Sequence, residues 1–211
     1  MSLELSGTTP AIKGVAGSVS APAITGDDAD TGISFPSANT IKFSTGGVER
    51  MSITDSGVTG AGGKFASYAI ICDQKSAGTN GGTMNSGTWH TRDLNTEIAD
   101  ADGIVSISSN QFTLQAGTYL IKANAPGYYV QDHMIKLYNV TASADIAFGT
   151  SAYTNIQAQT RSFLNVRITI SAARTFEIRH RCTTTKASNG FGESTGLAVE
   201  KYLIVEIYKE S

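Results

Sequence analysis

Residues 161–182 read RSFLNVRITISAARTFEIRHRC and contain the two clearest amphipathic strands of the chain. The residues of the inward phase occupy every second position: Leu164, Val166, Ile168 and Ile170 in the first strand, then Phe176, Ile178, His180 and Cys182 in the second. Because successive side chains of a strand point to opposite faces, each strand has one dry face and one wet face. This pattern predicts an all-β fold.

Seven further segments are rich in β-branched or aromatic residues and are bounded by turn-forming residues. These segments are residues 65–72, 88–94, 104–107, 112–114, 118–125, 134–140 and 197–208. Together with the first two, they make nine predicted strands, which are enough for a sandwich over residues 64–211. A domain of this size buries most of its unfolded surface.

Residues 1–63 have a different composition. They hold half of the 22 glycines and three of the four prolines, but only Phe35 and Phe43 of the 17 aromatic residues. So little apolar area cannot offset the entropy of ordering the backbone. Weak strand-and-turn units at 18–26 and 51–57, with a hairpin around Thr45-Gly46-Gly47, predict a thin β stalk that pairs with identical chains. We therefore predict a Gly-rich trimeric stalk over 1–63 and a β-sandwich head over 64–211.

The first and last strands of the head are apolar on both faces. Opposite the core-facing residues lie Tyr68 and Ile70 in the first strand, and Tyr202, Ile204 and Tyr208 in the last. One face packs inside the sandwich, so the other needs a second protein surface. We predict that these five residues form a homotrimer interface.

Composition excludes several classes of function. Lys and Arg do not cluster as nucleic-acid binding requires, and no apolar run approaches the roughly 20 residues of a membrane helix. Residues 1–20 lack a basic start and an apolar stretch, which predicts folding where the chain is made. Cys72 and Cys182 are predicted to be buried free thiols rather than a disulfide.

No motif indicates catalysis, a metal or a cofactor. The three histidines are scattered, and His180 is predicted to point inward to a hydrogen-bond partner. The acidic residues at 27–30 and 100–102 lack calcium-loop spacing and are interpreted as turn formers. No glycine-rich segment precedes a helix that could bind phosphate, and the serines are too plentiful to indicate a nucleophile. We predict a protein that is not an enzyme.

Part of the stalk resembles the short module that recurs in tailed-phage fibre and appendage proteins. The residues that carry this resemblance are Gly26–Pro36 (GDDADTGISFP), Ile41–Phe43, Gly46-Gly47, Glu49–Met51 and Ser56-Gly57. The resemblance implies a fibrous virion component assembled in the host bacterial cytoplasm, whose N-terminal segment attaches to other virion proteins.

The head resembles the trimeric jelly roll of the tumour necrosis factor and complement globular heads. Asn110–Leu114 (NQFTL), Ala116–Ile121 (AGTYLI) and Tyr202–Tyr208 carry this resemblance. Phage and bacterial versions of the head are matched through 78–82 (GTNGG), 88–96 (TWHTRDLNT) and 189–192 (NGFG). The resemblance covers nearly all of 65–209 and implies a homotrimer, but it leaves the ligand open.

Two loops are candidates for receptor binding, 73–83 and 183–196, which we expect at the end of the head remote from the stalk. The candidate residues are Lys75, Asn80, Lys186, Asn189, Phe191 and Glu193. Phe191 is either an exposed ring that binds sugars or a ring that packs inward. Trp89 is interpreted as a core or inter-subunit packing residue.

The favoured function is a homotrimeric phage fibre protein whose head binds a host surface glycan or outer-membrane protein. An alternative is a structural capsid-attached fibre or decoration protein without a specific receptor. A less favoured alternative is an enzyme that degrades surface polysaccharide.

Overall fold

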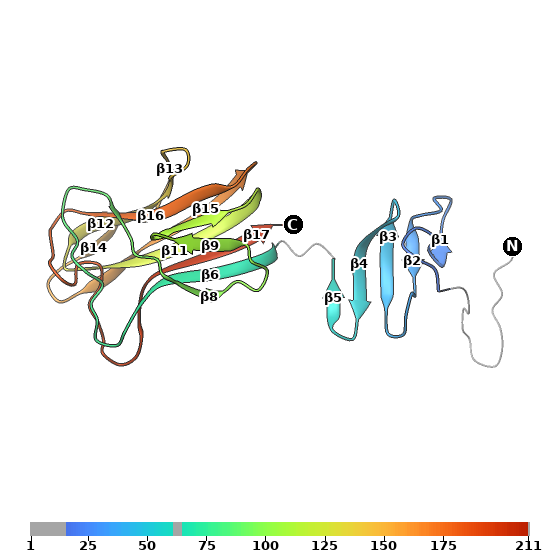
Figure 1. Ribbon diagram of the computed structural model, residues 1–211, viewed down its shortest axis with the longest axis horizontal. Helices are drawn as coiled ribbons and strands as arrows, with labels where there is room; N and C mark the ends of the chain where they lie inside the picture. Colours follow the sequence, from blue (N-terminus) through green and yellow to red (C-terminus); the bar gives the residue numbers. More distant parts are fainter. Residues whose placement is uncertain (1–15, 61–64, 211) are drawn as a thin grey trace. The chain divides into compact units, whose positions relative to one another are not determined.

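A computed structural model describes residues 16–60 and 65–210 of the chain, and in these ranges it contains strands and turns but no helix. No helix there is long and apolar enough to cross a membrane. The chain divides into two compact units, residues 1–63 and 64–211 (Figure 1). The all-β fold class predicted from the sequence is confirmed.

The first unit is a single five-stranded antiparallel sheet whose strands follow chain order. The strands are β1 (Ile24–Thr25), β2 (Gly32–Ser34), β3 (Ile41–Thr45), β4 (Val48–Thr54) and β5 (Gly57–Thr59). Gly46 and Gly47, with φ of 58° and 70°, form a two-residue turn between the paired residues Thr45 and Val48. A two-residue turn with positive φ at both positions matches the twist of the flanking strands, so the predicted hairpin is confirmed.

This first sheet buries no large apolar side chain among its described residues. Its fully buried residues are serines, namely Ser34, Ser44 and Ser52. Large apolar side chains remain exposed instead: Ile24, Phe35, Val48, Ile53 and Val58. The sheet is therefore poor in core, as its composition predicts, and its pairing into a trimeric stalk stays a prediction.

The second unit is a sandwich of two sheets. The first sheet has the order β15 (Gln159–Ile170), β11 (Gly117–Tyr128), β17 (Glu200–Glu210), β6 (Phe65–Lys75), β8 (Thr96–Ala99). The second has the order β13 (Ala144–Phe148), β12 (Gln131–Asn139), β16 (Arg174–Cys182), β10 (Gln111–Leu114), β9 (Val105–Ser108), with β14 (Ala152–Thr154) on β12 and β7 (His90–Thr91) on β16. From β11 to β17 the long strands β11, β12, β15, β16 and β17 alternate between the two sheets, which is the connectivity of a jelly roll, so that prediction is confirmed.

The core lies between the two sheets and is filled by the alternate positions of their strands. Phe112 and Phe176 pack with ring centres 5.7 Å apart, and the four predicted inward residues of β16 are all buried. Of the four predicted inward residues of β15, only Leu164 is fully buried, whereas Val166, Ile168 and Ile170 are partly buried. The difference arises because β15 is the edge strand of its sheet.

Several local predictions can be compared with the structure. Cys72 and Cys182 are buried free thiols, as predicted. Asp100 forms a turn, because its two carboxylate oxygens accept hydrogen bonds from the amides of Ile104 and Val105 at 2.8 and 3.0 Å. The strand predicted over 88–94 is wrong in length, since only His90 and Thr91 pair with β16.

Candidate binding site

The two predicted tip loops lie together at one end of the second unit and pair with each other. The amide of Gly81 donates to the carbonyl of Gly192 at 2.9 Å, and the amide of Phe191 donates to the carbonyl of Gly82 at 3.1 Å. This end lies opposite the start of β6 and the end of β17 (Figure 1). The loops therefore form one joined structure rather than two separate hairpin closures.

A single carboxylate fixes both loops. Glu200 is buried and accepts hydrogen bonds from the amides of Gly78, Thr195 and Gly196 at 3.2, 3.0 and 2.7 Å. These backbone donors, that of Gly196 foremost, lower the pKa of Glu200. The pattern of the sequence did not reveal this role, because Gly78 lies 122 residues away.

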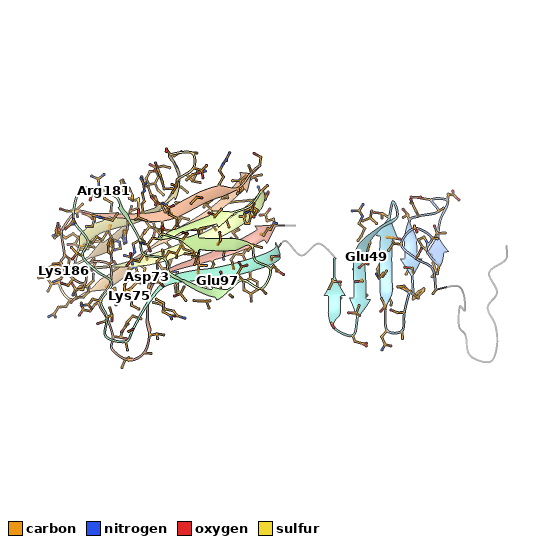
Figure 2. All side chains as sticks on the ribbon, in the orientation of Figure 1. Glu49, Asp73, Lys75, Glu97, Arg181 and Lys186 are labelled. Atoms are coloured by element: carbon orange, nitrogen blue, oxygen red, sulfur yellow. The ribbon has the colours of Figure 1, made fainter. Side chains whose placement is uncertain are left out.

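Three of the predicted receptor-binding residues contact other residues of this end of the unit. Lys75 Nζ lies 2.7 Å from Asp93 Oδ2, and Asn80 Oδ1 accepts the amide of Ser194 at 2.9 Å. Lys186 Nζ lies 5.2 Å from the ring centre of Tyr129. Figure 2 shows Lys75 and Lys186 at the loop end of the unit. Their part in receptor binding stays a prediction.

Three other predicted residues join the 183–196 loop to itself and to the core. The side-chain amide of Asn189 donates to the carboxylate of Glu193, and the backbone N–H of Glu193 donates to Gln159 Oε1 at 2.7 Å. Phe191 adopts the inward of its two alternatives: it packs on Met84, Val130 and Cys182. The aromatic ring of this loop thus packs against interior residues instead of forming an exposed contact surface.

Phe191 covers a buried arginine that the sequence did not reveal. Arg92 is 1% exposed, and its guanidinium carbon lies 4.3 Å from the ring centre of Phe191. It donates to the carbonyl oxygens of Phe191 and Pro126 at 3.0 and 3.4 Å. Burial lowers the pKa of Arg92 to about 10, so the group remains charged at neutral pH.

Two buried histidines continue this network with a single consistent direction of donation. Arg92 Nη1 lies 3.4 Å from His180 Nδ1, His180 Nε2 lies 2.9 Å from His133 Nδ1, and His133 Nε2 lies 2.9 Å from Thr160 Oγ1. Because arginine only donates, both imidazoles must be neutral with the proton on Nε2. Burial, followed by the charge of Arg92, lowers the pKa of His133 to about 4 and that of His180 well below its usual value. The prediction that His180 points inward to a partner is confirmed.

A pocket opens on the outer face of the second sheet, near the same end. Its volume is about 350 Å³, and it is lined by Trp89, Asp132, His133, Met134, Ser151, Ala152, Arg181, Cys182 and Thr183. Met134 pairs with Arg181 across β12 and β16, so both side chains lie on the outer face. The alternate positions His133 and Cys182 are buried and form the floor.

Trp89 forms a wall of this pocket, although the sequence indicated only core or inter-subunit packing. A buried lysine holds the indole in place: Lys136 Nζ lies 4.3 Å from its ring centre and 2.5 Å from Asp145 Oδ1. Phe148 packs beside it with ring centres 6.0 Å apart. The one tryptophan of the chain is thus fixed at the edge of an open pocket.

The predicted trimer interface residues lie on the outer face of the first sheet, with one exception. Tyr68 is 54% exposed, and Ile70, Ile204 and Tyr208 are partly exposed. Tyr202 is only 2% exposed, because its own loops cover it. Its hydroxyl donates to the carbonyl of Thr79 at 2.7 Å, and a methyl group at position 192 would overlap its ring. Tyr202 is therefore not part of an exposed surface, contrary to the prediction.

In the described part of the chain, no group of three or more His, Cys, Asp or Glu side chains is arranged to hold a metal ion.

Comparisons with known proteins identify similar folds only. No protein-family model and no curated protein matches the chain. The chain is similar to the globular domain of zebrafish complement 1qA protein, with 11% identity, a TM-score of 0.43, and coverage of 67% of this chain and 95% of that one. It is also similar to murine APRIL at pH 5.0, with 6% identity, a TM-score of 0.45, and coverage of 68% and 98%. The jelly-roll assignment depends on the strand order given above, and at these scores the similarities carry nothing about function.

Proposed function

We propose that the chain is a homotrimeric fibre protein of a tailed-phage virion. Its second unit binds a receptor on the host surface without catalysis, and its N-terminal segment attaches to other virion proteins. The protein is assembled in the host bacterial cytoplasm and is carried on the virion. The resemblance of residues 26–57 described above supports the assignment to a virion, and that of residues 110–121 supports the homotrimer.

The observation that carries the proposal is a cluster of exposed and partly exposed apolar side chains on the outer face of the first sheet of the sandwich. Tyr68 and Phe163 are half exposed there, and Ile70, Leu120 and Ile204 are partly exposed between them on β6, β11 and β17. The opposite positions of the same strands, such as Ile71 and Val205, are fully buried in the core. An exposed apolar cluster on the outer side of a sheet whose inner side is already buried in the core is characteristic of a protein interface.

The charged side chains on this face contact an aromatic residue of the same face. Tyr208 donates its hydroxyl to Glu206 Oε2 at 2.7 Å, and Lys122 Nζ lies 5.4 Å from the Tyr208 ring centre. Glu206 and Lys122 thus both contact Tyr208. Such a mixed surface suits contact between identical copies around an axis.

The first unit supports the same proposal on independent grounds. Its described residues bury only serines and leave five large apolar side chains exposed. A sheet with so little core gains most of its stability by packing against further protein. Identical chains and a neighbouring virion protein are the partners that we propose for it.

Sedimentation equilibrium of the full chain at micromolar concentration tests the trimer. We expect a particle of three times the chain mass of 22.1 kDa. A single chain mass would overturn the proposal.

Adsorption of the labelled protein to a panel of bacterial cells tests receptor binding. A stable trimer that adsorbs to no cell would favour the structural fibre without a specific receptor. Release of reducing ends from surface polysaccharide would favour an enzyme.

A further inference from the structure

We infer that the pocket beside Trp89 binds a pyranose sugar that carries a carboxylate group. The inference deepens the proposed receptor function, since it names the ligand class and moves the site from the tip loops to the outer face of the second sheet. The pocket volume of about 350 Å³ lies within the usual range of small-molecule sites.

The charges on this sheet face single out Arg181. Three basic side chains follow one another across β12 and β16, and two of them have carboxylate partners: Lys136 pairs with Asp145, and Arg179 pairs with Glu177, both at 2.5 Å. The side chain of Arg181 is exposed and makes no hydrogen bond or ion pair with any residue in the ranges 16–60 and 65–210. Figure 2 shows it at the loop end of the unit. Its guanidinium is therefore free to bind an anion.

Two further polar groups line the pocket without a partner. The indole N–H of Trp89 and the hydroxyl of Ser151 make no hydrogen bond within the described residues. Neither atom is sealed from solvent. A mainly apolar pocket with a few convergent, unsatisfied polar groups is the usual form of a specific ligand site.

The acidic residue of the pocket is already engaged. Thr183 Oγ1 lies 3.4 Å from Asp132 Oδ2 and accepts the amide of Asp132 at 3.1 Å. The pocket thus contains one unpaired cation and one carboxylate with a hydroxyl beside it. This arrangement favours a ligand with one negative charge and several hydroxyl groups over a phosphate or a cation.

The chemistry of an acidic sugar matches these groups. A guanidinium binds a carboxylate through two parallel charge-assisted hydrogen bonds. The indole offers a flat apolar surface to the C–H face of a pyranose, and its N–H can donate to a hydroxyl oxygen. Ser151 can donate or accept a hydrogen bond, and the Asp132 carboxylate can accept hydrogen bonds from sugar hydroxyls.

Titration of the isotope-labelled full chain with D-glucuronate, followed by amide NMR shifts, tests the pocket directly. We expect saturable shifts at residues 132–134, 151–152 and 181–183, with a Kd of about 1 mM, since single sites of this kind are weak. D-glucose and acetate, which each lack one half of the ligand, should bind at least about tenfold more weakly. Equal binding of D-glucose, or no saturation up to roughly 50 mM glucuronate, would overturn the inference.

Substitutions supply the matched controls. Arg181→Gln should weaken glucuronate binding about tenfold or more, whereas Arg174→Gln on the same strand, outside the pocket, should leave it unchanged. Trp89→Phe keeps a ring over Lys136 and should weaken binding less than Arg181→Gln. Amide spectra of each variant establish that the fold is intact. Equal affinities of the two arginine variants would contradict the assignment of Arg181.

Cell adsorption separates this inference from the proposed function. If the native trimer adsorbs to cells and Arg181→Gln adsorbs equally, the receptor function stands and the pocket is not its site. If the native protein is a monomer that adsorbs to no cell, the proposed function fails, while the glucuronate titration still decides whether the pocket binds an acidic sugar.

Discussion

At the scale of single residues, the neutral pair His133 and His180 makes stability depend on pH. An unfolded histidine titrates near 6.5, whereas burial lowers the pKa of His133 to about 4. The unfolded chain therefore binds the proton first, so the stabilisation is complete above pH 6.5 and is lost as the pH falls from 6.5 towards 4. For His133 alone we expect the free energy of unfolding to be about 2 kcal/mol lower at pH 5 than at pH 7, as measured by urea denaturation.

The matched variant for this prediction is His133→Gln, whose amide can still donate to Thr160 but does not titrate. We expect it to be less stable at pH 7 and to show a flatter dependence between pH 7 and pH 5. An unchanged slope would mean that other groups set the pH dependence.

Within the buried network, the sequence predicted the position of His180 but not that of Arg92. His180 could be placed because it alternates with Ile178 and Cys182 along a single strand. Arg92 could not, because its main partners, His180 and Phe191, lie 88 and 99 residues away. A buried arginine that donates to distant carbonyl oxygens and lies against an aromatic ring has no local pattern in the sequence.

At the scale of elements, Glu200 is expected to set the rigidity of the tip loops. Glu200→Ala removes the acceptor of three backbone amides, at Gly78, Thr195 and Gly196. We expect faster hydrogen exchange at these amides, with little change in the core strand β16. Unchanged exchange at all three amides would show that the loop-to-loop hydrogen bonds suffice without the carboxylate.

Every long strand of the second unit could be predicted, whereas some of its short edge strands could not. All nine predicted strands are present, because each carries several β-branched or aromatic residues in alternation. Three were missed: β8, β13 and β14 are three to five residues long and lie at sheet edges. Trp89 lies just before a two-residue strand and covers the outer sheet face. Its place in a pocket could not be predicted, because so short a strand has no alternation of apolar and polar residues.

At the scale of the whole molecule, the sequence identified the strands that are apolar on two sides, but not which of their residues the chain covers for itself. Tyr202 has the same phase as Ile204 and Tyr208, yet the tip loops bury it. Loops that fold back over a sheet end are set by long-range contacts, which alternation does not encode. The exposed part of the proposed interface is therefore centred on Tyr68 and Ile204.

The proposed trimer and the pocket are linked by avidity, and one pair of variants tests that link. Tyr68 and Tyr153 are 54% and 55% exposed, but Tyr68 lies on the proposed interface and Tyr153 on β14 of the other sheet. Tyr68→Glu places an unpaired charge in the interface, so we expect single chains by sedimentation, whereas Tyr153→Glu should stay a trimer.

The dissociated variant keeps its pocket, so its Kd for glucuronate should match that of the native chain. Its apparent affinity for cells should nevertheless fall by about 100-fold or more, because three linked weak sites bind a surface far better than one. A monomeric Tyr68→Glu chain that adsorbs as tightly as the trimer would show that adsorption depends on one strong site and that the assembly contributes nothing to it.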